Sequence, residues 1–164
     1  MDRREVDKIL EVAMKMYTPE NITELMPDEV FVFGSNPQGR HGSGAAKDAI
    51  DKFGAIYGQG IGLQGQCYAI PTKDMQKLEP LSLKEIDWHV ENFLYFALRN
   101  RQITFLVTKI GCGLAGLSVD VIAPMFIGHP ENVILPYEFV ESIKMYELQE
   151  VLDECYQSGT SIAR

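Results

Sequence analysis

The sequence predicts an α/β protein, a three-layer α/β/α sandwich around a mixed, mostly parallel sheet. The first observation behind this class is a set of short, nearly continuous apolar runs, as expected of strands that are covered on both faces. The second is that amphipathic helical patterns separate these runs, because alternation of strands and helices favours a parallel sheet. The runs occupy residues 30–34, 67–71, 103–108 and 132–136.

Apolar spacing and capping signals place the first three helices. The first ends before Pro19 and carries apolar residues three and four positions apart from Val6 onward. The second begins inside the stretch 42–54. The third opens at Ser82, and Glu85 completes a capping box at its start.

Two more helices are expected toward the carboxyl end. A short one follows Ser118 and is interrupted by Pro124, which lacks the N–H that its turn would need. We expect residues 1–164 to form a single domain, with its core over about 20–136 and with flanking amino- and carboxy-terminal helices. The last helix places four residues on one stripe: Met145, Leu148, Leu152 and Cys155.

Composition and charge exclude several classes of protein. Hydrophobic residues make up 46% and charged residues 23% of the chain, which is typical of a globular protein. The net charge of −8 argues against a broad surface for nucleic acid or for an anionic membrane. No apolar run reaches the roughly 18 residues of a membrane-spanning helix. Three widely spaced cysteines without a CxxC motif fit a reducing compartment, so we expect a cytoplasmic protein.

Two glycine-rich loops follow predicted strands and lead into predicted helices. In an open α/β sheet, ligands bind at the carboxyl ends of the strands, and backbone N–H groups before a helix form an anion site. We therefore expect the loops to hold a phosphate-like group, although a plain turn would explain either one alone. The first loop contains Gly34, Ser35, Asn36, Gly39, Arg40, His41, Gly42, Ser43 and Gly44, followed by Ala45. The second contains Gly111, Cys112, Gly113, Leu114, Ala115 and Gly116.

Three cations stand in or beside these loops: Arg40, Lys73 and Lys109. A solvated residue at a strand end is the simpler interpretation of each one, but together they favour an anion site. The stretch 60–65 matches GxGxxG, yet it follows a helix and precedes a strand, the reverse of a dinucleotide-binding context. We interpret it as a loop. Histidines and cysteines without ligand spacing argue against a metal site, and no cofactor is expected.

Three side chains are candidates for chemistry. Cys112 lies near a helix start, where a thiolate would be stabilised, and only His41 is placed to act as its base. The alternative is a small residue that a tight binding loop tolerates. Lys73 could neutralise phosphate charge or attack an anomeric carbon, or it could be a surface lysine. Asn36 could bind ribose hydroxyls or orient a water, or it could form a turn before Pro37.

Together these stretches resemble the macrodomain superfamily of ADP-ribose-binding modules. The segment ENIT at 20–23 leads to VFVFGSN at 30–36 and GRHGSGAA at 39–46, at nearly the spacing of the macrodomain motifs. The likeness is closer to the terminal ADP-ribose protein glycohydrolase branch, through GSGAAKDAIDKFG, YAIPTKD and IGCGLAG. The sequence is also similar to bacterial and phage-encoded macro-like proteins that share FGSN, GRHG and KIGCGLAG. The likeness covers roughly residues 20–136.

The resemblance implies an α/β/α sandwich that binds ADP-ribose or a related nucleotide, with an ADP-ribosylated protein as a further partner. The two loops would clasp the diphosphate and the distal ribose. Lys73 matches the lysine of the glycohydrolase branch, and with Asn36 it supports ADP-ribosyl hydrolase activity. The catalytic residues implied are therefore Lys73 and Asn36.

Two positions depart from the pattern of these families. Asn21 stands where macrodomains usually have the aspartate that reads adenine, and Ala115 replaces the aspartate that works with the lysine. Asp74 and Asp120 are nearby in sequence as substitutes for that carboxylate. Two alternatives to ADP-ribosyl hydrolysis therefore stay open. One is a non-catalytic nucleotide sensor or sequestering module in phage–host or NAD-related signalling, and the other is a hydrolase that depends on Cys112.

Overall fold

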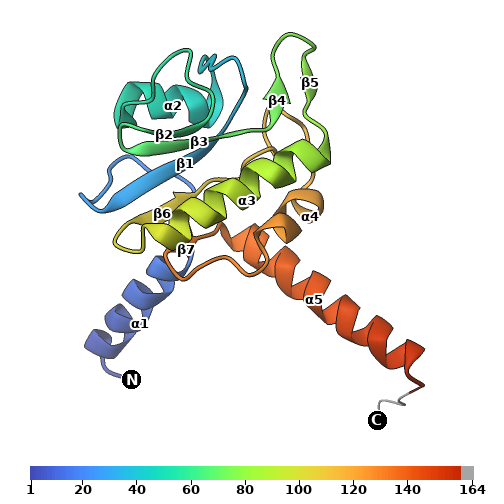
Figure 1. Ribbon diagram of the computed structural model, residues 1–164. Helices are drawn as coiled ribbons and strands as arrows, with labels where there is room; N and C mark the ends of the chain where they lie inside the picture. The colour runs from blue at the N-terminus through green and yellow to red at the C-terminus, as the bar shows by residue number, and fades with distance from the viewer. Residues whose placement is uncertain (160–164) are drawn as a thin grey trace.

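The computed structural model describes residues 1–159, with only the backbone at Met14. Its central sheet has five strands in the order β2-β3-β1-β6-β7 (Figure 1). β2 is antiparallel to β3, and the other neighbours are parallel. The α/β class with a mixed, mostly parallel sheet is confirmed. The strands are β1 (Glu29–Ser35), β2 (Gly62–Gln64), β3 (Cys67–Pro71), β6 (Thr104–Val107) and β7 (Val133–Ile134).

The first four helices agree with the limits that the sequence predicted, whereas the last helix begins at Tyr137, eight residues before the predicted stripe from Met145. The hydroxyl of Ser82 accepts a hydrogen bond from the Glu85 N–H at 3.3 Å, and the Glu85 carboxylate accepts one from the Ser82 N–H at 3.0 Å, so the capping box is confirmed. Pro124 stands in a 3₁₀ turn that ends the short helix, as predicted. The helices are α1 (Arg3–Met16), α2 (Gly44–Phe53), α3 (Leu83–Arg99), α4 (Val119–Ile122), the 3₁₀ turn η1 (Ala123–Phe126) and α5 (Tyr137–Gln157).

Three short strands were not predicted. The stretch 60–65, interpreted as a loop, contains the edge strand β2, because residues 62–64 pair with residues 67–69 of β3. The strands β4 (Lys73–Asp74) and β5 (Glu79–Pro80) form a separate two-stranded hairpin. Its residues are polar or exposed, so no apolar run signals it.

Both faces of the sheet are covered, by two separate apolar clusters. Side chains alternate along β1, so Phe31 and Phe33 point to one face while Val30 and Val32 point to the other. The first face packs against α2 through Ala46, Ala49 and Phe53. The second packs against α3, α4, η1 and the start of α5, through the residues Ile86, Val90, Phe93, Ile122, Phe126 and Phe139. This double coverage explains why the central strands are continuously apolar.

The helices α1 and α5 leave the domain at the same end and diverge from each other (Figure 1). Their bases are joined by an edge-to-face contact of the Tyr17 and Tyr137 rings, with centroids 5.3 Å apart. The Thr18 N–H also donates to the Leu135 carbonyl at 2.9 Å. Beyond this base the two helices are mostly exposed. Within residues 1–159, no helix combines the length and the apolar character needed to span a membrane.

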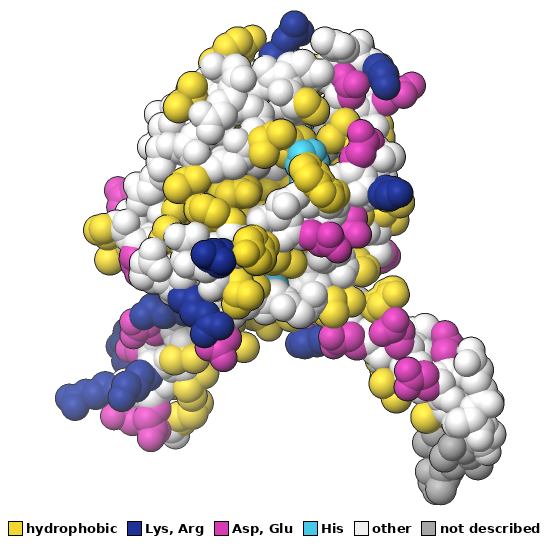
Figure 2. Space-filling model, in the orientation of Figure 1, with side chains coloured by type: hydrophobic (Ala, Val, Ile, Leu, Met, Phe, Trp, Pro, Cys, Tyr) yellow, Lys and Arg dark blue, Asp and Glu magenta, His cyan; other side chains and the backbone are white. Residues whose placement is uncertain are grey.

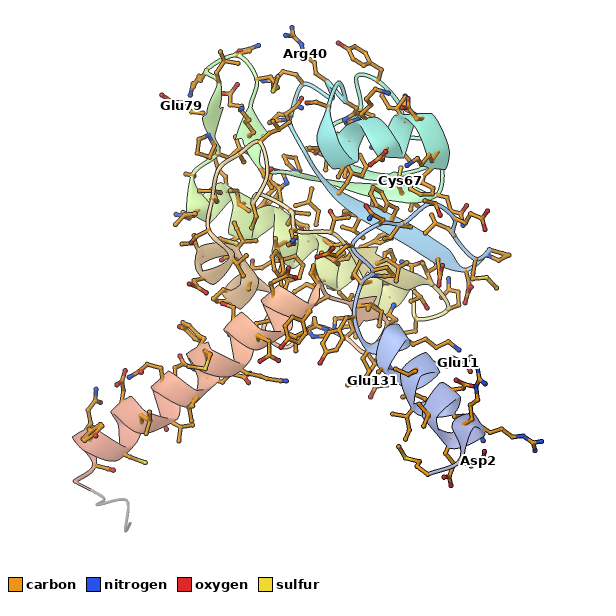
Figure 3. All side chains as sticks on the ribbon, turned by 180° about the vertical axis from the view of Figure 1, so that it is seen from behind. Asp2, Glu11, Arg40, Cys67, Glu79 and Glu131 are labelled. Atoms are coloured by element: carbon orange, nitrogen blue, oxygen red, sulfur yellow. The ribbon has the colours of Figure 1, made fainter. Side chains whose placement is uncertain are left out.

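The buried thiol of Cys67 should make the stability of the protein depend on pH in the alkaline range. Cys67 lies on β3 beneath α2 with none of its surface exposed, and burial raises the pKa of its thiol to about 12 (Figure 3). The folded state therefore favours the protonated thiol, whereas the unfolded chain ionises near an ordinary thiol pKa of about 8.5. The thiol's contribution to stability is complete below that pKa and is lost as the pH rises toward 12.

We expect the free energy of unfolding to fall with pH between about 9 and 11, with Cys67 contributing about 1.4 kcal/mol per pH unit. Urea titrations at several pH values measure this slope. The Cys67→Ala variant loses stability at every pH, but its slope should be shallower by that amount. Burial also raises the pKa of Tyr68, which contributes equally to both proteins. Equal slopes in the two proteins would contradict this assignment.

Candidate functional site

A pocket opens where three adjacent parallel strands end. Its cavity volume is about 700 Å³. β1 ends at Ser35, β3 at Pro71 and β6 at Val107, and the segments that follow each of these ends contribute to the wall. The two glycine-rich loops therefore line a single cavity. The lining residues are 34–36, 40, 42–46, 57, 72, 73, 75, 108–111 and 113–115.

The first loop is shaped by the side chain of Asn36. Its Nδ2 donates to the Arg40 carbonyl at 2.8 Å, and its Oδ1 accepts from the Arg40 N–H at 2.9 Å. Asn36 is buried. Both ends of its amide are therefore bonded to the loop backbone, which fixes the path of the chain along the pocket wall.

A second segment, residues 58–60, is hydrogen-bonded to this loop and packs against it. The Gly39 carbonyl accepts from the Gly58 N–H at 2.8 Å, and the hydroxyl of Ser35 donates to the Gly60 carbonyl. Gly39 has a φ of +66°, and a Cβ there would lie 2.3 Å from the Gly58 carbonyl carbon. Only glycine fits this position without strain.

His41 belongs to the same support and does not line the pocket. Its ring is buried, lies edge-on to Phe33 at 5.2 Å, and its Nε2 is 2.9 Å from the Gln59 carbonyl oxygen. Its Nδ1 has no hydrogen-bond partner among the described residues. The imidazole thus stabilises the back of the first loop.

The first loop ends in the amino terminus of α2, which faces the pocket. Ser43 is the N-cap residue, and its side chain makes no capping hydrogen bond. No acidic residue occurs in the first turn. The first N–H groups of a helix have no partner within it, so those of Gly44, Ala45 and Ala46 are available to an anion in the pocket.

The second loop faces the first across the cavity. Gly111, Gly113, Leu114 and Ala115 line the pocket, and a Cβ added at Gly44 would lie 4.0 Å from the Leu114 Cδ1. The loop is closed by hydrogen bonds from the Gly116 N–H to the Gly113 carbonyl and from the Leu117 N–H to the Gly111 carbonyl, both 2.9 Å long. Lys73 also donates to the Leu114 carbonyl at 3.0 Å, which ties β4 to this loop.

The charged side chains of the pocket wall are all cationic. Arg40, Lys73 and Lys109 line it, whereas none of the lining residues is Asp, Glu or His. Lys109 is held by Glu138 at 3.0 Å, and this hydrogen bond raises the pKa of the lysine. Arg40 lies at the end of the domain away from α1 and α5, with its side chain exposed (Figure 3). In a chain of net charge −8, the pocket is thus a local cationic site.

The other candidates for chemistry lie outside the pocket wall. Cys112 is half-buried, and burial raises the pKa of its thiol, which opposes formation of the thiolate that a nucleophile needs. The Asp74 carboxylate accepts hydrogen bonds from the N–H groups of Gln76 and Lys77, which lower its pKa. The Asp120 carboxylate accepts from the Ser142 hydroxyl at 2.9 Å.

Most of the residues predicted to bind the ligand or to be catalytic meet in this pocket, and four of them do not. Asn21 is exposed on the connection between α1 and β1, and it is not part of the pocket wall. The other three, His41, Cys112 and Gly116, belong to the loops but do not line the cavity. The structure adds residues that sequence reasoning missed: Ala46, Tyr57, Thr72, Met75, Thr108 and Ile110.

Two of the missed residues could have been found from the sequence. Thr72 and Thr108 each come directly after a strand, at the carboxyl ends where ligands bind in α/β sheets. Tyr57 and Met75 lie on connections with no local motif.

The described residues contain no group of histidine, cysteine or acidic side chains that could hold a metal ion. Comparisons with protein-family models, with curated proteins and with solved structures found no match to this chain.

Proposed function

We propose that the protein binds ADP-ribose or a related nucleotide in this pocket. The observation that carries the proposal is the charge of the wall. Arg40, Lys73 and Lys109 line it, no acidic side chain does, and the chain as a whole carries a net charge of −8. A phosphate-bearing ligand is the class that such a wall favours, because Arg40 and Lys73 can form charge-assisted hydrogen bonds with it, while Lys109 is already paired with Glu138.

The backbone supports the same ligand class. The amino terminus of α2 presents N–H groups beside the first loop, where a diphosphate would be stabilised by the helix dipole. A volume of about 700 Å³ lies within the range of small-molecule sites. Tyr57 and Leu114 line the pocket with largely exposed side chains, available to a ribose or a base.

We propose in addition that the fold is a macrodomain-like α/β/α sandwich. Supporting this are the helices on both faces of the mostly parallel sheet and the position of the resembling motifs. The motifs at 34–36, 39–46 and 110–116 all contribute to the pocket wall.

The proposed activity is binding without turnover, as in a nucleotide sensor. Neither a carboxylate nor an imidazole lines the pocket to act as general base. Lys73 is engaged with the Leu114 carbonyl, and the amide of Asn36 is bonded to the loop backbone. An ADP-ribosyl hydrolase that uses Lys73 remains the second proposal, which rests on the lysine's position in the wall.

A thermal-shift and calorimetry panel of ADP-ribose, ADP and NAD tests the binding proposal. With ligand at about a hundredfold its dissociation constant, we expect about 2.7 kcal/mol of stabilisation. The Arg40→Gln variant should bind about tenfold more weakly, which corresponds to roughly 1.5 kcal/mol for a hydrogen bond to a charged group. Lys84→Gln on the exposed face of α3 is the matched control and should bind as the wild type does.

The absence of any shift with the whole panel would contradict the proposed ligand class. Incubation with an ADP-ribosylated carboxylate ester separates a sensor from a hydrolase. No release of ADP-ribose is expected. Release that disappears in Lys73→Ala would establish the hydrolase instead.

A further inference from the structure

The two projecting helices carry apolar side chains that nothing in the described chain covers. On α1, Ile9 and Leu10 are 55% and 53% exposed, and they share a stripe with Val6, Ala13 and Met16. On the outer part of α5 the exposed apolar residues are Met145, Tyr146, Leu148, Val151 and Tyr156, beside the half-buried Leu152 and Cys155. We refer to residues 3–16 and 145–157 as the two arms.

The apolar side of α5 changes along its length. Phe139, Val140 and Ile143 pack against the domain core at the base of the helix. From Met145 onward, the apolar stripe of Met145, Leu148, Leu152 and Cys155 lies about 150° around the helix axis from those residues, at about 100° per residue. The outer stripe therefore points away from the side that the domain occupies. The chain's own domain does not cover it.

The arms differ in charge. The α1 arm has four basic and three acidic residues, which gives 4 − 3 = +1. The whole of α5 has one basic and six acidic residues, which gives 1 − 6 = −5. Figure 2 shows both dark blue and magenta side chains on the α1 arm and mainly magenta ones among the charged side chains along α5. Two copies of α5 would repel each other, whereas α1 and α5 attract.

The two arms of one chain do not meet, because they diverge from a common base (Figure 1). That base is fixed by the contact of Tyr17 with Tyr137 and by the hydrogen bond between Thr18 and Leu135. Each chain thus carries two arms of opposite net charge, but its own α1 arm cannot pack on its own α5 arm. A second copy can supply an α5 arm for the α1 arm of the first copy, and an α1 arm for its α5 arm.

We propose that the protein forms a symmetric dimer in which the α1 arm of each copy packs on the α5 arm of the other. A two-fold axis makes both contacts at once and closes the assembly, and the four arms then form two separate α1–α5 helix pairs. The lengths match, since 14 residues of α1 and 13 residues of the α5 arm each span about 20 Å. The nucleotide pocket, at the other end of the domain, takes no part in this contact.

Light scattering after gel filtration tests the dimer. At 18.5 kDa per chain, the expected mass is 2 × 18.5 = 37 kDa. Leu10→Glu and Leu148→Glu each place a charge in the proposed contact, and both variants should be monomeric at 50 µM with an unchanged helical circular-dichroism spectrum. The matched control is Leu98→Glu on the exposed side of α3, which should remain dimeric. A wild-type monomer at 50 µM, or a Leu148→Glu variant that remains dimeric, would overturn the proposal.

Cross-linking tests which arms pair. If the arms enter from opposite sides, the tip of α5 reaches the base of α1 in the other copy. Met16→Cys should then be joined by a short bismaleimide to the native Cys155 of that copy, and adding Cys155→Ser should abolish the covalent dimer. A wild-type dimer joined through Cys155 alone, with no gain from Met16→Cys, would show that α5 pairs with itself and would overturn the α1–α5 arrangement.

Discussion

Replacing Phe93 with alanine should lower the free energy of unfolding by about 3–5 kcal/mol. The Phe93 side chain has none of its surface exposed and stands between the sheet and α3. Its ring lies 5.0 Å from the Tyr68 ring and 5.4 Å from the Phe105 ring, centroid to centroid. Truncation removes both contacts and leaves a cavity that neighbouring strands cannot fill without moving.

Urea denaturation followed by fluorescence measures this loss. The matched control is Tyr95→Ala, two residues along the same helix, where the side chain is 61% exposed. That substitution should change the free energy of unfolding by no more than about 0.5 kcal/mol. A loss below 1 kcal/mol for Phe93→Ala would mean that α3 packs less tightly on the sheet than the structure shows.

Replacing Gly60 with alanine should destabilise the protein by about 3 kcal/mol and weaken the proposed nucleotide binding at the same time. A Cβ at Gly60 would lie 2.0 Å from the Asn36 carbonyl oxygen and 2.9 Å from that of Pro37. Both are backbone atoms, so the first loop must move away to admit the methyl group. The same movement displaces Arg40 and the amino terminus of α2 from the pocket wall.

Denaturation and calorimetry on the same preparations measure the two effects. Gly42→Ala is the matched control within the first loop, because a Cβ there has no atom within 4 Å. Its stability should equal or slightly exceed that of the wild type. Wild-type stability in Gly60→Ala would contradict the close packing of residues 58–60 against the first loop.

The sequence predicted the parts of the fold that depend on continuous burial. Strands covered on both faces must be apolar throughout, so four of the five strands of the central sheet were visible as apolar runs. β2 was missed because its three residues, Gly62–Gln64, have no apolar pattern of their own. That strand exists through pairing with β3, which no local signal encodes.

The candidate site was predicted where it depends on strand ends and missed where it depends on tertiary contacts. Ligands bind at the carboxyl ends of parallel strands in α/β sheets, and from this rule the sequence predicted that both glycine loops contribute to one site. The rule does not say which face of a loop a side chain takes, so it could not separate Arg40, which lines the pocket, from His41, which supports the loop from behind. Tyr57 and Met75 reach the wall only because the connections fold over it.

The strand order has a consequence for how the protein behaves at high concentration. The longest strand, β1 with seven residues, is in the middle of the sheet, while the edges are β2 with three residues and β7 with two. An exposed edge offers unpaired N–H and C=O groups to other chains, and short edges offer few of them. The sheet is therefore a poor template for cross-β aggregation, although α1 and α5 of a single chain carry exposed apolar side chains.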